Sequence, residues 1–203
     1  MKRSKQEKQQ THQRIVRKAA QQVRVEGVNG VGIAELMGQA GLTHGGFYAH
    51  FRNKDALLAE ICREGMAETL GQLFQAIESA PAGTELSALV NSYLSVSHRD
   101  HPATGCVMPT LAADIARRPE EVRTAFTQAY EEFLERIIPF LPGDAGENQL
   151  DEAIILLAGM VGAVLLARTI NDSTLSERIV RVNRDFYTQT FSKEHPEEEG
   201  SAP

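Results

Sequence analysis

The stretch Gly41-Leu-Thr-His-Gly-Gly-Phe-Tyr-Ala-His-Phe51 is the most informative part of this 203-residue chain. It begins at a glycine turn and continues as a very short helix whose middle holds Gly45 and Gly46. Each glycine inside a helix costs about 1 kcal/mol relative to alanine, so the segment is poorly suited to forming a stable helix. Adjacent glycines do let a helix backbone lie close to a bulky surface, which Tyr48 and His50 can also reach. We therefore interpret the stretch as a helix that docks on duplex DNA.

The distribution of charge along the chain agrees with this interpretation. Residues 1–63 carry 11 Lys and Arg against 5 Asp and Glu, a net charge of +6. Residues 64–203 carry 10 against 22, a net charge of −12. The split predicts a basic end that faces nucleic acid and an acidic body. The simpler alternative, an uneven scatter of surface charge, stays open.

Apolar residues recur about every 3.6 positions along most of the chain, which predicts an all-α fold. The expected helices cover 6–26, a short piece of 30–41, 43–51, 53–79, 85–98, 107–116, 120–140, 148–171 and 173–191. Gly27 and Gly41 suit helix ends. Thr43 and Asn53 suit N-terminal caps. The acidic tail at 192–203 is expected to be disordered.

Several features predict a cytoplasmic protein. Cys62 and Cys106 are too few for a disulfide framework, so both thiols are expected to be free. The N-terminal residues lack the apolar core of a signal peptide. The longest apolar run, Ala153–Ala167, is shorter than the ~20 residues that span a bilayer.

Residues 27–58, Gly-Val-Asn-Gly-Val-Gly-Ile-Ala-Glu-Leu-Met-Gly-Gln-Ala-Gly-Leu-Thr-His-Gly-Gly-Phe-Tyr-Ala-His-Phe-Arg-Asn-Lys-Asp-Ala-Leu-Leu, resemble the DNA-binding domain of TetR-family transcriptional repressors. The features that coincide are the Gly41 turn, Phe47-Tyr48, His50-Phe51 and Asn53-Lys54-Asp55. The resemblance covers residues 9–69, with the helix-turn-helix motif at 32–51. It implies that residues 70–191 form a helical domain for effector binding and dimerisation.

This resemblance implies a homodimer whose two heads enter successive major grooves of a palindromic operator, about 34 Å apart. It places a set of residues at the DNA, namely Thr43, His44, Gly45, Gly46, Tyr48 and His50, and it places Lys54 at a phosphate. Phe47 is expected to be buried against the first helix. Most family members carry hydroxyl residues where this chain has Val31-Gly32, so that phosphate contact is in doubt here.

The last two expected helices fit a dimer interface, which the family forms as a four-helix bundle. Small residues at helical spacing permit close helix approach, and larger apolar residues add area. The predicted interface residues are Ala158, Gly159, Gly162, Ala163, Leu166, Ile179, Val182 and Phe186. The core of a single chain would show a similar pattern.

The resemblance also implies a cavity for a small effector of unknown identity, between the middle helices. Residues that suit its lining are Met66, Leu70, Phe74, Met108, Leu111, Phe126, Tyr130 and Met160. For each of them, ordinary core packing is the competing interpretation.

Cys106 follows Gly105 at the expected start of a helix, where backbone amides favour a thiolate, the reactive form of cysteine. The Gly-Cys pair is similar to one in a TetR subset that senses oxidants and electrophiles through that cysteine. A buried, inert thiol is the alternative. Cys62 lies in an amphipathic stripe and is expected to pack in the core.

The sequence predicts neither a metal site nor an enzyme. His98, His101 and Cys106 have a spacing that would suit zinc, but their segment is typical of a polar turn. Phosphate-binding, nucleophile-elbow and HExxH motifs are absent from the sequence, and no cofactor is implied. Two alternatives to a repressor remain, namely a DNA-binding activator or architectural protein, and a helical thiol enzyme built on Cys106 and His101.

Overall fold

The computed structural model describes residues 5–142 and 147–191, which form helices and turns without a strand. The elements in chain order are α1 (Lys5–Gly30), α2 (Ile33–Gln39), the 3-10 helix η1 (His44–Ala49), α3 (Lys54–Glu78), α4 (Glu85–Tyr93), α5 (Val96–Asp100), η2 (Pro102–Thr104), α6 (Met108–Ile115), α7 (Glu120–Ile137), η3 (Ile138–Phe140), α8 (Glu147–Thr169) and α9 (Ser173–Thr190). The all-α prediction is confirmed. The tail at 192–203 lies outside the described residues.

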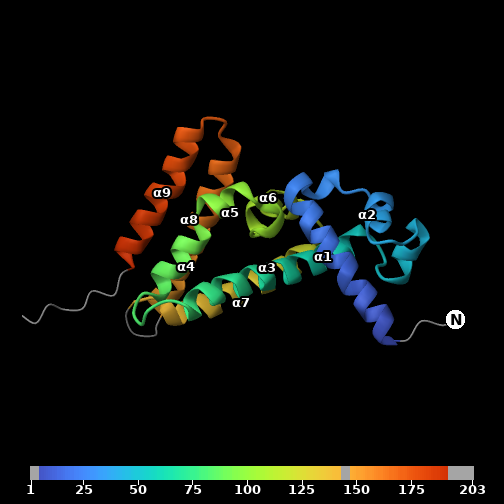
Figure 1. Cartoon of the computed structure of the whole chain (residues 1–203). Coiled ribbons are helices and arrows are strands. Elements are labelled where there is room, and N and C mark those ends of the chain that lie inside the picture. The colour runs from blue at the N-terminus through green and yellow to red at the C-terminus, as the bar shows by residue number, and fades with distance from the viewer. Residues whose placement is uncertain (1–4, 143–146, 192–203) are drawn as a thin grey trace, which may run out of the picture.

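Helix α3 connects the two parts of the molecule. Its 25 residues span about 37 Å at a rise of about 1.5 Å per residue. In Figure 1, α3 runs from α1 near the N-terminus to the far end, with α7 alongside it and α8 and α9 forming a hairpin. We call α1, α2 and η1 the head, and α4 to α9 the body.

The head folds around aromatic side chains. Phe47 of η1 is fully buried, as predicted. Its ring centroid lies 5.4 Å from that of Phe51, which in turn stacks on His12 of α1 at 4.5 Å. Aromatic contacts of this kind stabilise a core beyond the area that they bury. The two phenylalanines therefore hold η1 in place despite its adjacent glycines.

Most of the predicted helix ends agree with the structure. The Asn53 side chain accepts a hydrogen bond of 2.8 Å from a backbone N–H in the first turn of α3. Gly41 has a φ of +69°, a region that favours glycine, at the turn before η1. Gly27, with a φ of +71°, ends the regular part of α1. Thr43 precedes η1, but its side chain makes no capping bond.

The single helix predicted at 85–98 is wrong, because α4 and α5 are separate helices. Ser95 lies at the break between them. Its hydroxyl donates to the carbonyl of Ser92 at 2.9 Å and accepts from the backbone N–H of His98 at 3.0 Å. A serine that bonds to nearby backbone groups competes with helix continuation. The break creates the corner in which the His98 side chain lies.

Helix α8 is more apolar than the sequence estimate allowed for. By length and composition alone, the stretch Asn148–Thr169 is long and apolar enough to span a membrane. The apolar segment is therefore longer than the run Ala153–Ala167 identified from the sequence. Within the fold, 39% of its most apolar window is buried. The rest contributes to an exposed face that α8 shares with α9.

One glycine allows α8 and α9 to pack closely. A Cβ atom at Gly159 would overlap the phenol oxygen of Tyr187 and lie 2.6 Å from its Cζ atom. A Cβ at Gly162 or at Gly71 would meet nothing within 4 Å. Gly159 is therefore required for packing within the chain, whereas Gly162 and Gly71 are not.

We expect Gly159→Ala to lower the free energy of unfolding by about 1–3 kcal/mol, the usual cost of overpacking. Gly71→Ala is the matched control, because it adds the same methyl group to a helix with open space around it. It should raise stability by up to about 1 kcal/mol through helix propensity. Urea unfolding at a fixed protein concentration measures both changes. If Gly159→Ala were as stable as the wild type, the close packing of α8 on α9 would be refuted.

Candidate nucleic-acid interface and effector cavities

Residues 43–48 present a polar strip on the surface of the head. Thr43, His44 and Gly45 are exposed, and Tyr48 is 59% exposed. The rings of His44 and Tyr48 meet edge to face with centroids 6.0 Å apart. This contact holds two hydrogen-bonding side chains beside each other on the surface. Such groups suit phosphates and base edges.

The two glycines of the strip are not required by the fold of the chain. A Cβ at Gly45 would meet nothing within 4 Å. A Cβ at Gly46 would make ordinary contacts of 3.6 Å with Met37 and Thr43. The packing of the head therefore does not explain why both positions are glycine. Close approach of an external partner at these two glycines stays a prediction from the sequence.

Lys54, predicted at a phosphate, is partly engaged within the chain. Its ammonium donates a hydrogen bond of 2.7 Å to the carbonyl oxygen of Val31, in the turn before α2. Burial lowers the pKa of Lys54, as does nearby Arg118, whereas Asp55 opposes the shift. An ammonium group carries three donors. Lys54 can thus fix the start of α2 and still contact a phosphate, which stays a prediction. His50 is half-buried beside His12, with ring centroids 5.7 Å apart.

Three residues around α6 bind the body to the head, and we call Thr110, Asp114 and Arg118 the α6 latch. Their contacts are Thr110 Oγ1 to the Arg24 carbonyl at 3.1 Å, the Val28 N–H to Asp114 Oδ2 at 3.4 Å, and Arg118 Nη2 to Asn29 Oδ1 at 3.3 Å. Sequence reasoning missed this latch. The one signal was Asp114 itself, a carboxylate between apolar residues of a short helix.

Cys106 is fully buried, and the expected fall in its pKa is wrong. Burial raises the pKa of the thiol, although hydrogen bonds with Tyr93 and the Met108 amide partly offset the effect. The backbone N–H of Cys106 donates to His98 Nε2 at 2.9 Å, while His98 Nδ1–H donates to the Tyr93 carbonyl at 2.7 Å. Desolvation exceeds the stabilisation of a thiolate by the helix start. Cys62 is also buried, which raises its pKa to about 12.

The predicted apolar pocket residues lie in the core. Met66, Met108, Leu111 and Met160 are at most 1% exposed, and Leu70 is 4% exposed. Phe74, Phe126 and Tyr130 are half-buried and pack against the same core. None of the eight lines either of the two body cavities described next.

Two other spaces open in the body. The first, which we call the hydroxyl cavity, has a volume of about 310 Å³ between α3, α4, α5 and η2 and is lined mainly by Ser, Thr and His. The second, the arginine groove, has a volume of about 670 Å³ where α1, α5 and α8 meet, and Arg24, Arg99 and Arg168 contribute to its lining. Arg99 pairs with Asp100 there.

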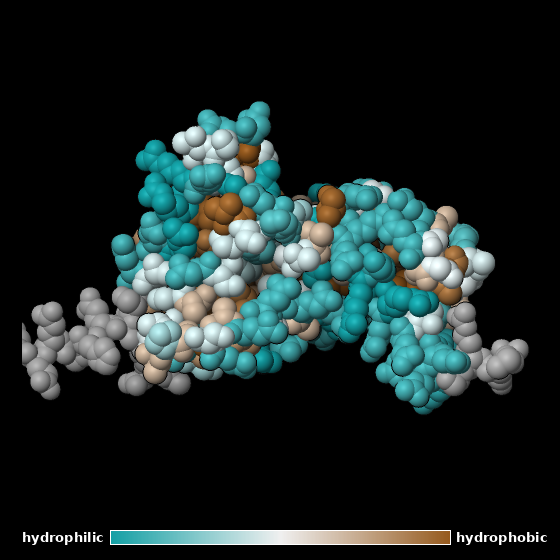
Figure 2. All heavy atoms as spheres, viewed as in Figure 1, coloured by the Kyte–Doolittle hydropathy of each residue, from teal (hydrophilic) through white to brown (hydrophobic). Residues whose placement is uncertain are grey.

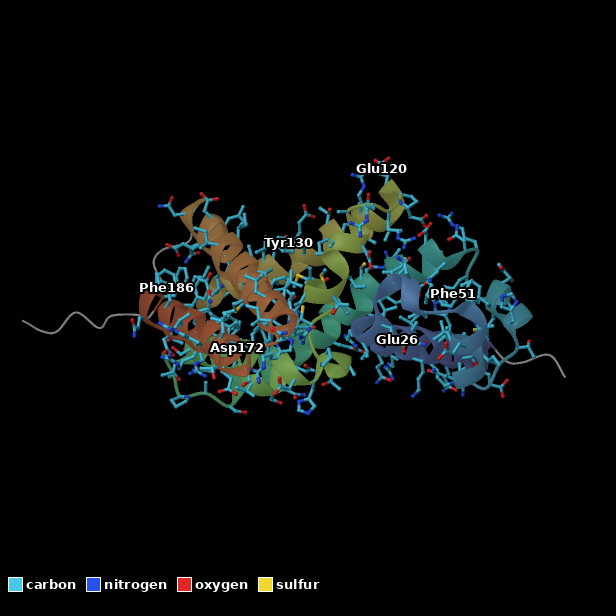
Figure 3. All side chains as sticks on the ribbon, turned by 90° about the horizontal axis from the view of Figure 1, so that it is seen from above. Glu26, Phe51, Glu120, Tyr130, Asp172 and Phe186 are labelled. Carbon is cyan, nitrogen blue, oxygen red and sulfur yellow. The ribbon has the colours of Figure 1, made fainter. Side chains whose placement is uncertain are left out.

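An exposed apolar face covers one side of α8 and α9, and we call it the apolar strip. Its residues are 39–57% exposed: Leu150, Ile154, Ile155, Leu165, Leu166, Leu175, Val182 and Phe186. Figure 2 shows the side of the molecule on which α9 is mostly hydrophilic, and Figure 3 shows Phe186 farther from the head than Asp172 at the α8–α9 turn. A contiguous face of this kind marks an interaction surface.

The predicted interface residues divide between this strip and the chain's own core. Ala158 is exposed and Gly162 and Ile179 are half-exposed, so they lie beside the strip. Ala163 is only 4% exposed, and Gly159 packs on Tyr187. Some small residues of α8 therefore pack within the chain, and others lie on the surface beside the apolar strip.

Two family models match the chain. The model described as "Bacterial regulatory proteins, tetR family" matches residues 15–61, which include the polar strip and the start of α3. The model described as "Tetracyclin repressor-like, C-terminal domain" matches residues 82–182 in the body. No curated protein matches the sequence.

Solved structures share the fold at low sequence identity. The TetR-family regulator from Cytophaga hutchinsonii aligns with a TM-score of 0.76 and 17% identity, over 96% of this chain and all of that one. The reduced form of NemR from E. coli aligns with a TM-score of 0.73 and 19% identity, over 89% and 96%. A TetR regulator from Chloroflexus aurantiacus gives 0.72 and 22%, over 91% and 97%.

The exposed strip on a helix-turn-helix head, the α3 connection and the helical body agree with both family models. The chain belongs to the TetR family of DNA-binding transcriptional regulators.

Proposed function

We propose that this chain is a transcriptional repressor that binds a palindromic operator as a homodimer and leaves it when a small effector binds. The observation that carries the proposal is the exposed polar strip at 43–48, which lies on a region of net charge +6. Positive charge attracts any DNA sequence, whereas hydrogen-bonding groups on a groove-sized element read bases. The acidic body keeps the rest of the chain away from the duplex.

Within the strip we assign different tasks to different residues. Thr43, His44, Gly45 and Gly46 would face the major groove, where the glycines permit close approach. Tyr48, His50 and Lys54 would contact the phosphate backbone. Base contacts give sequence preference, while phosphate contacts give affinity and register.

The apolar strip supports dimerisation. Eight large apolar side chains on two adjacent helices are costly to leave in water, and a second copy of the same face would bury them symmetrically. In this arrangement α8 and α9 of two chains form a four-helix bundle. The two heads would then read half-sites about 34 Å apart.

Effector release would act through the α6 latch. Thr110 and Asp114 contact the end of α1 directly, so a displacement of α6 would reorient the head. A rotation of each head changes the separation between them, and a rigid operator tolerates little change. We place this activity in the cytoplasm, where the operator DNA lies.

Covalent modification of Cys106 is the second route to release. The structural similarity to NemR, whose structure from E. coli is of a reduced form, supports this route. The burial of Cys106 and its raised pKa oppose it, because the thiolate is the reactive species. A reversibly bound effector is therefore the preferred account.

The first prediction tests the repressor proposal by selection of bound duplexes from a random library. We expect enrichment of a palindrome, with log K falling by about 0.9 for each neutralised phosphate as log salt rises. Lys54→Ala should weaken binding to all sequences and flatten the salt dependence. His44→Ala should instead relax preference at one base of each half-site, at about 1–3 kcal/mol. No enriched palindrome, or a salt-independent affinity, would contradict the repressor proposal.

The second prediction concerns the apolar strip. Phe186→Asp should weaken dimerisation by about 2 kcal/mol or more, because it places a charge in a buried contact. Val96→Asp is the control, since Val96 is 47% exposed on the body outside the strip. Sedimentation equilibrium gives the dimer dissociation constant of each variant. Equal effects of the two substitutions would argue against the strip as the interface.

The third prediction concerns Cys106, studied in the Cys62→Ser variant so that one thiol remains. A thiol reagent should modify native Cys106 far more slowly at pH 7 than the same residue in denaturant. Because burial raises its pKa, the thiolate fraction and the native rate should rise only as pH exceeds the ordinary value. Fast native modification together with loss of operator binding would restore the covalent route, and Cys106→Ser would then resist release.

A further inference from the structure

We propose that the hydroxyl cavity is the effector site and that it takes a small uncharged molecule carrying N–H or O–H groups. The proposal rests on the repressor function proposed above. It replaces the apolar pocket expected from the sequence with a polar space between α3, α4, α5 and η2.

The size and lining of the cavity suit a small polar molecule. Its volume of about 310 Å³ is at the lower end of the range of about 300–1,000 Å³ typical of ligand sites. Five Ser and Thr side chains line it, namely Thr69, Ser92, Ser95, Ser97 and Thr104. A wholly apolar occupant would displace water from these hydroxyls without replacing its hydrogen bonds, and each unsatisfied group is costly.

The hydrogen bonds already present determine which partners the cavity offers. Thr69, Ser95 and Thr104 each donate their hydroxyl proton to a backbone carbonyl, at 2.9, 2.9 and 3.3 Å. Each hydroxyl oxygen has two lone pairs and so keeps acceptor capacity, although one lone pair of Ser95 already accepts from the His98 backbone N–H. The Ser92 hydroxyl forms no hydrogen bond with any residue in 5–142 or 147–191. The cavity therefore favours a ligand that supplies donors.

Apart from the imidazoles of His98 and His101, the lining has no side chain that can be charged at pH 7. It contains no Asp, Glu, Lys or Arg side chain. Burial lowers the pKa of His98 to about 4, so its ring is neutral at pH 7, and both ring nitrogens are occupied by backbone groups. Arg168 lies behind Gly105 and donates to the carbonyls of His98 and Arg99. A charged ligand would lose hydration with no carboxylate, ammonium or guanidinium group of the lining in contact.

The cavity is also connected to the head. Gln72 of α3 donates to the carbonyl of Thr104 at 3.2 Å, which ties α3 to η2 at the cavity wall. The chain then passes through Gly105 and Cys106 into α6, whose Thr110 and Asp114 contact α1. A ligand that bonds with Thr104 or separates α3 from η2 would move the start of α6. The latch would transmit this movement to the head.

Benzamide, benzoate and benzamidine test the proposal, because they share a shape and differ in charge at pH 7. Each is added at about 10 mM to the full-length protein, and the shift in Tm reports binding to the folded state. We expect stabilisation by benzamide and none by the two ions. Operator affinity, measured by fluorescence anisotropy, should fall in benzamide.

Two matched pairs locate the binding. Ser92→Leu fills the cavity from α4 and should weaken benzamide binding by about tenfold or more, whereas Ser87→Leu makes the same change on α4 outside the cavity and should not. Thr104→Val keeps the shape of the side chain but removes its hydroxyl, which is an acceptor for the ligand and the donor to the His101 carbonyl, so it should also weaken binding. It covers the case in which Ser92→Leu fails to fold.

Several results would overturn the proposal. They are no stabilisation by benzamide, equal or greater stabilisation by either ion, or unchanged benzamide binding in both Ser92→Leu and Thr104→Val. Benzamide binding without loss of operator affinity would refute the effector role while leaving the repressor function intact. Failure of the ligand-free wild type to bind any operator would refute the repressor function, and the Tm shifts would still decide whether the cavity binds.

Discussion

The joint between head and body depends on one buried guanidinium. Arg24 of α1 is only 3% exposed, and its Nη2 atom pairs with Glu68 of α3 at 2.8 Å. The same side chain reaches the carbonyls of Gly65 and Ala103, which brings α1, α3 and η2 together. The Glu68 side chain is 36% exposed, so water screens the ion pair, and the two backbone carbonyls supply the other hydrogen bonds of the buried guanidinium. Arg24 therefore joins α1 to α3 and η2 at a single point.

The packing around Arg24 explains two other features of the chain. A Cβ at Gly65 would lie 2.5 Å from a methyl carbon of Val107 and 3.4 Å from Arg24 Nη2, so glycine lets α3 approach both. The carbonyl of Arg24 accepts from Thr110, so the same residue holds α6 through its backbone and α3 through its side chain. The orientation of the head is thus set where α3, η2 and α6 converge on α1.

Local pattern predicted the parts of the fold that depend on local energetics. The periodicity located most helices, Asn53 capped α3 as expected, and Phe47 is buried because an apolar ring on a weak helix has no other stable position. The break before α5 was not predicted, because it depends on the Ser95 hydroxyl forming hydrogen bonds with nearby backbone groups and not with solvent. The structural roles of Arg24 and Asp114 were not predicted, because hydrophobic periodicity assigns charged residues to the surface. Contacts with other elements keep these two side chains largely buried. The residues proposed to contact DNA remain predictions drawn from the family motif.

The same distinction applies to the thiol and to the cavity. A helix start lowers the pKa of a cysteine, but the desolvation of the fully buried Cys106 outweighs that effect together with those of Tyr93, Met108, Thr69 and Arg24. The hydroxyl cavity exists because the α4–α5 break leaves backbone groups that Ser95 and His98 satisfy, which makes its wall polar. A ligand shifts a regulator only by its difference in affinity between two conformations. The wall that a ligand would contact here adjoins η2 and leads into α6, whose Thr110 and Asp114 are joined to α1 by single hydrogen bonds. Contacts at this wall can therefore differ between two orientations of α6, whereas contacts deep in the core formed by Met66, Leu111 and Met160 would change less.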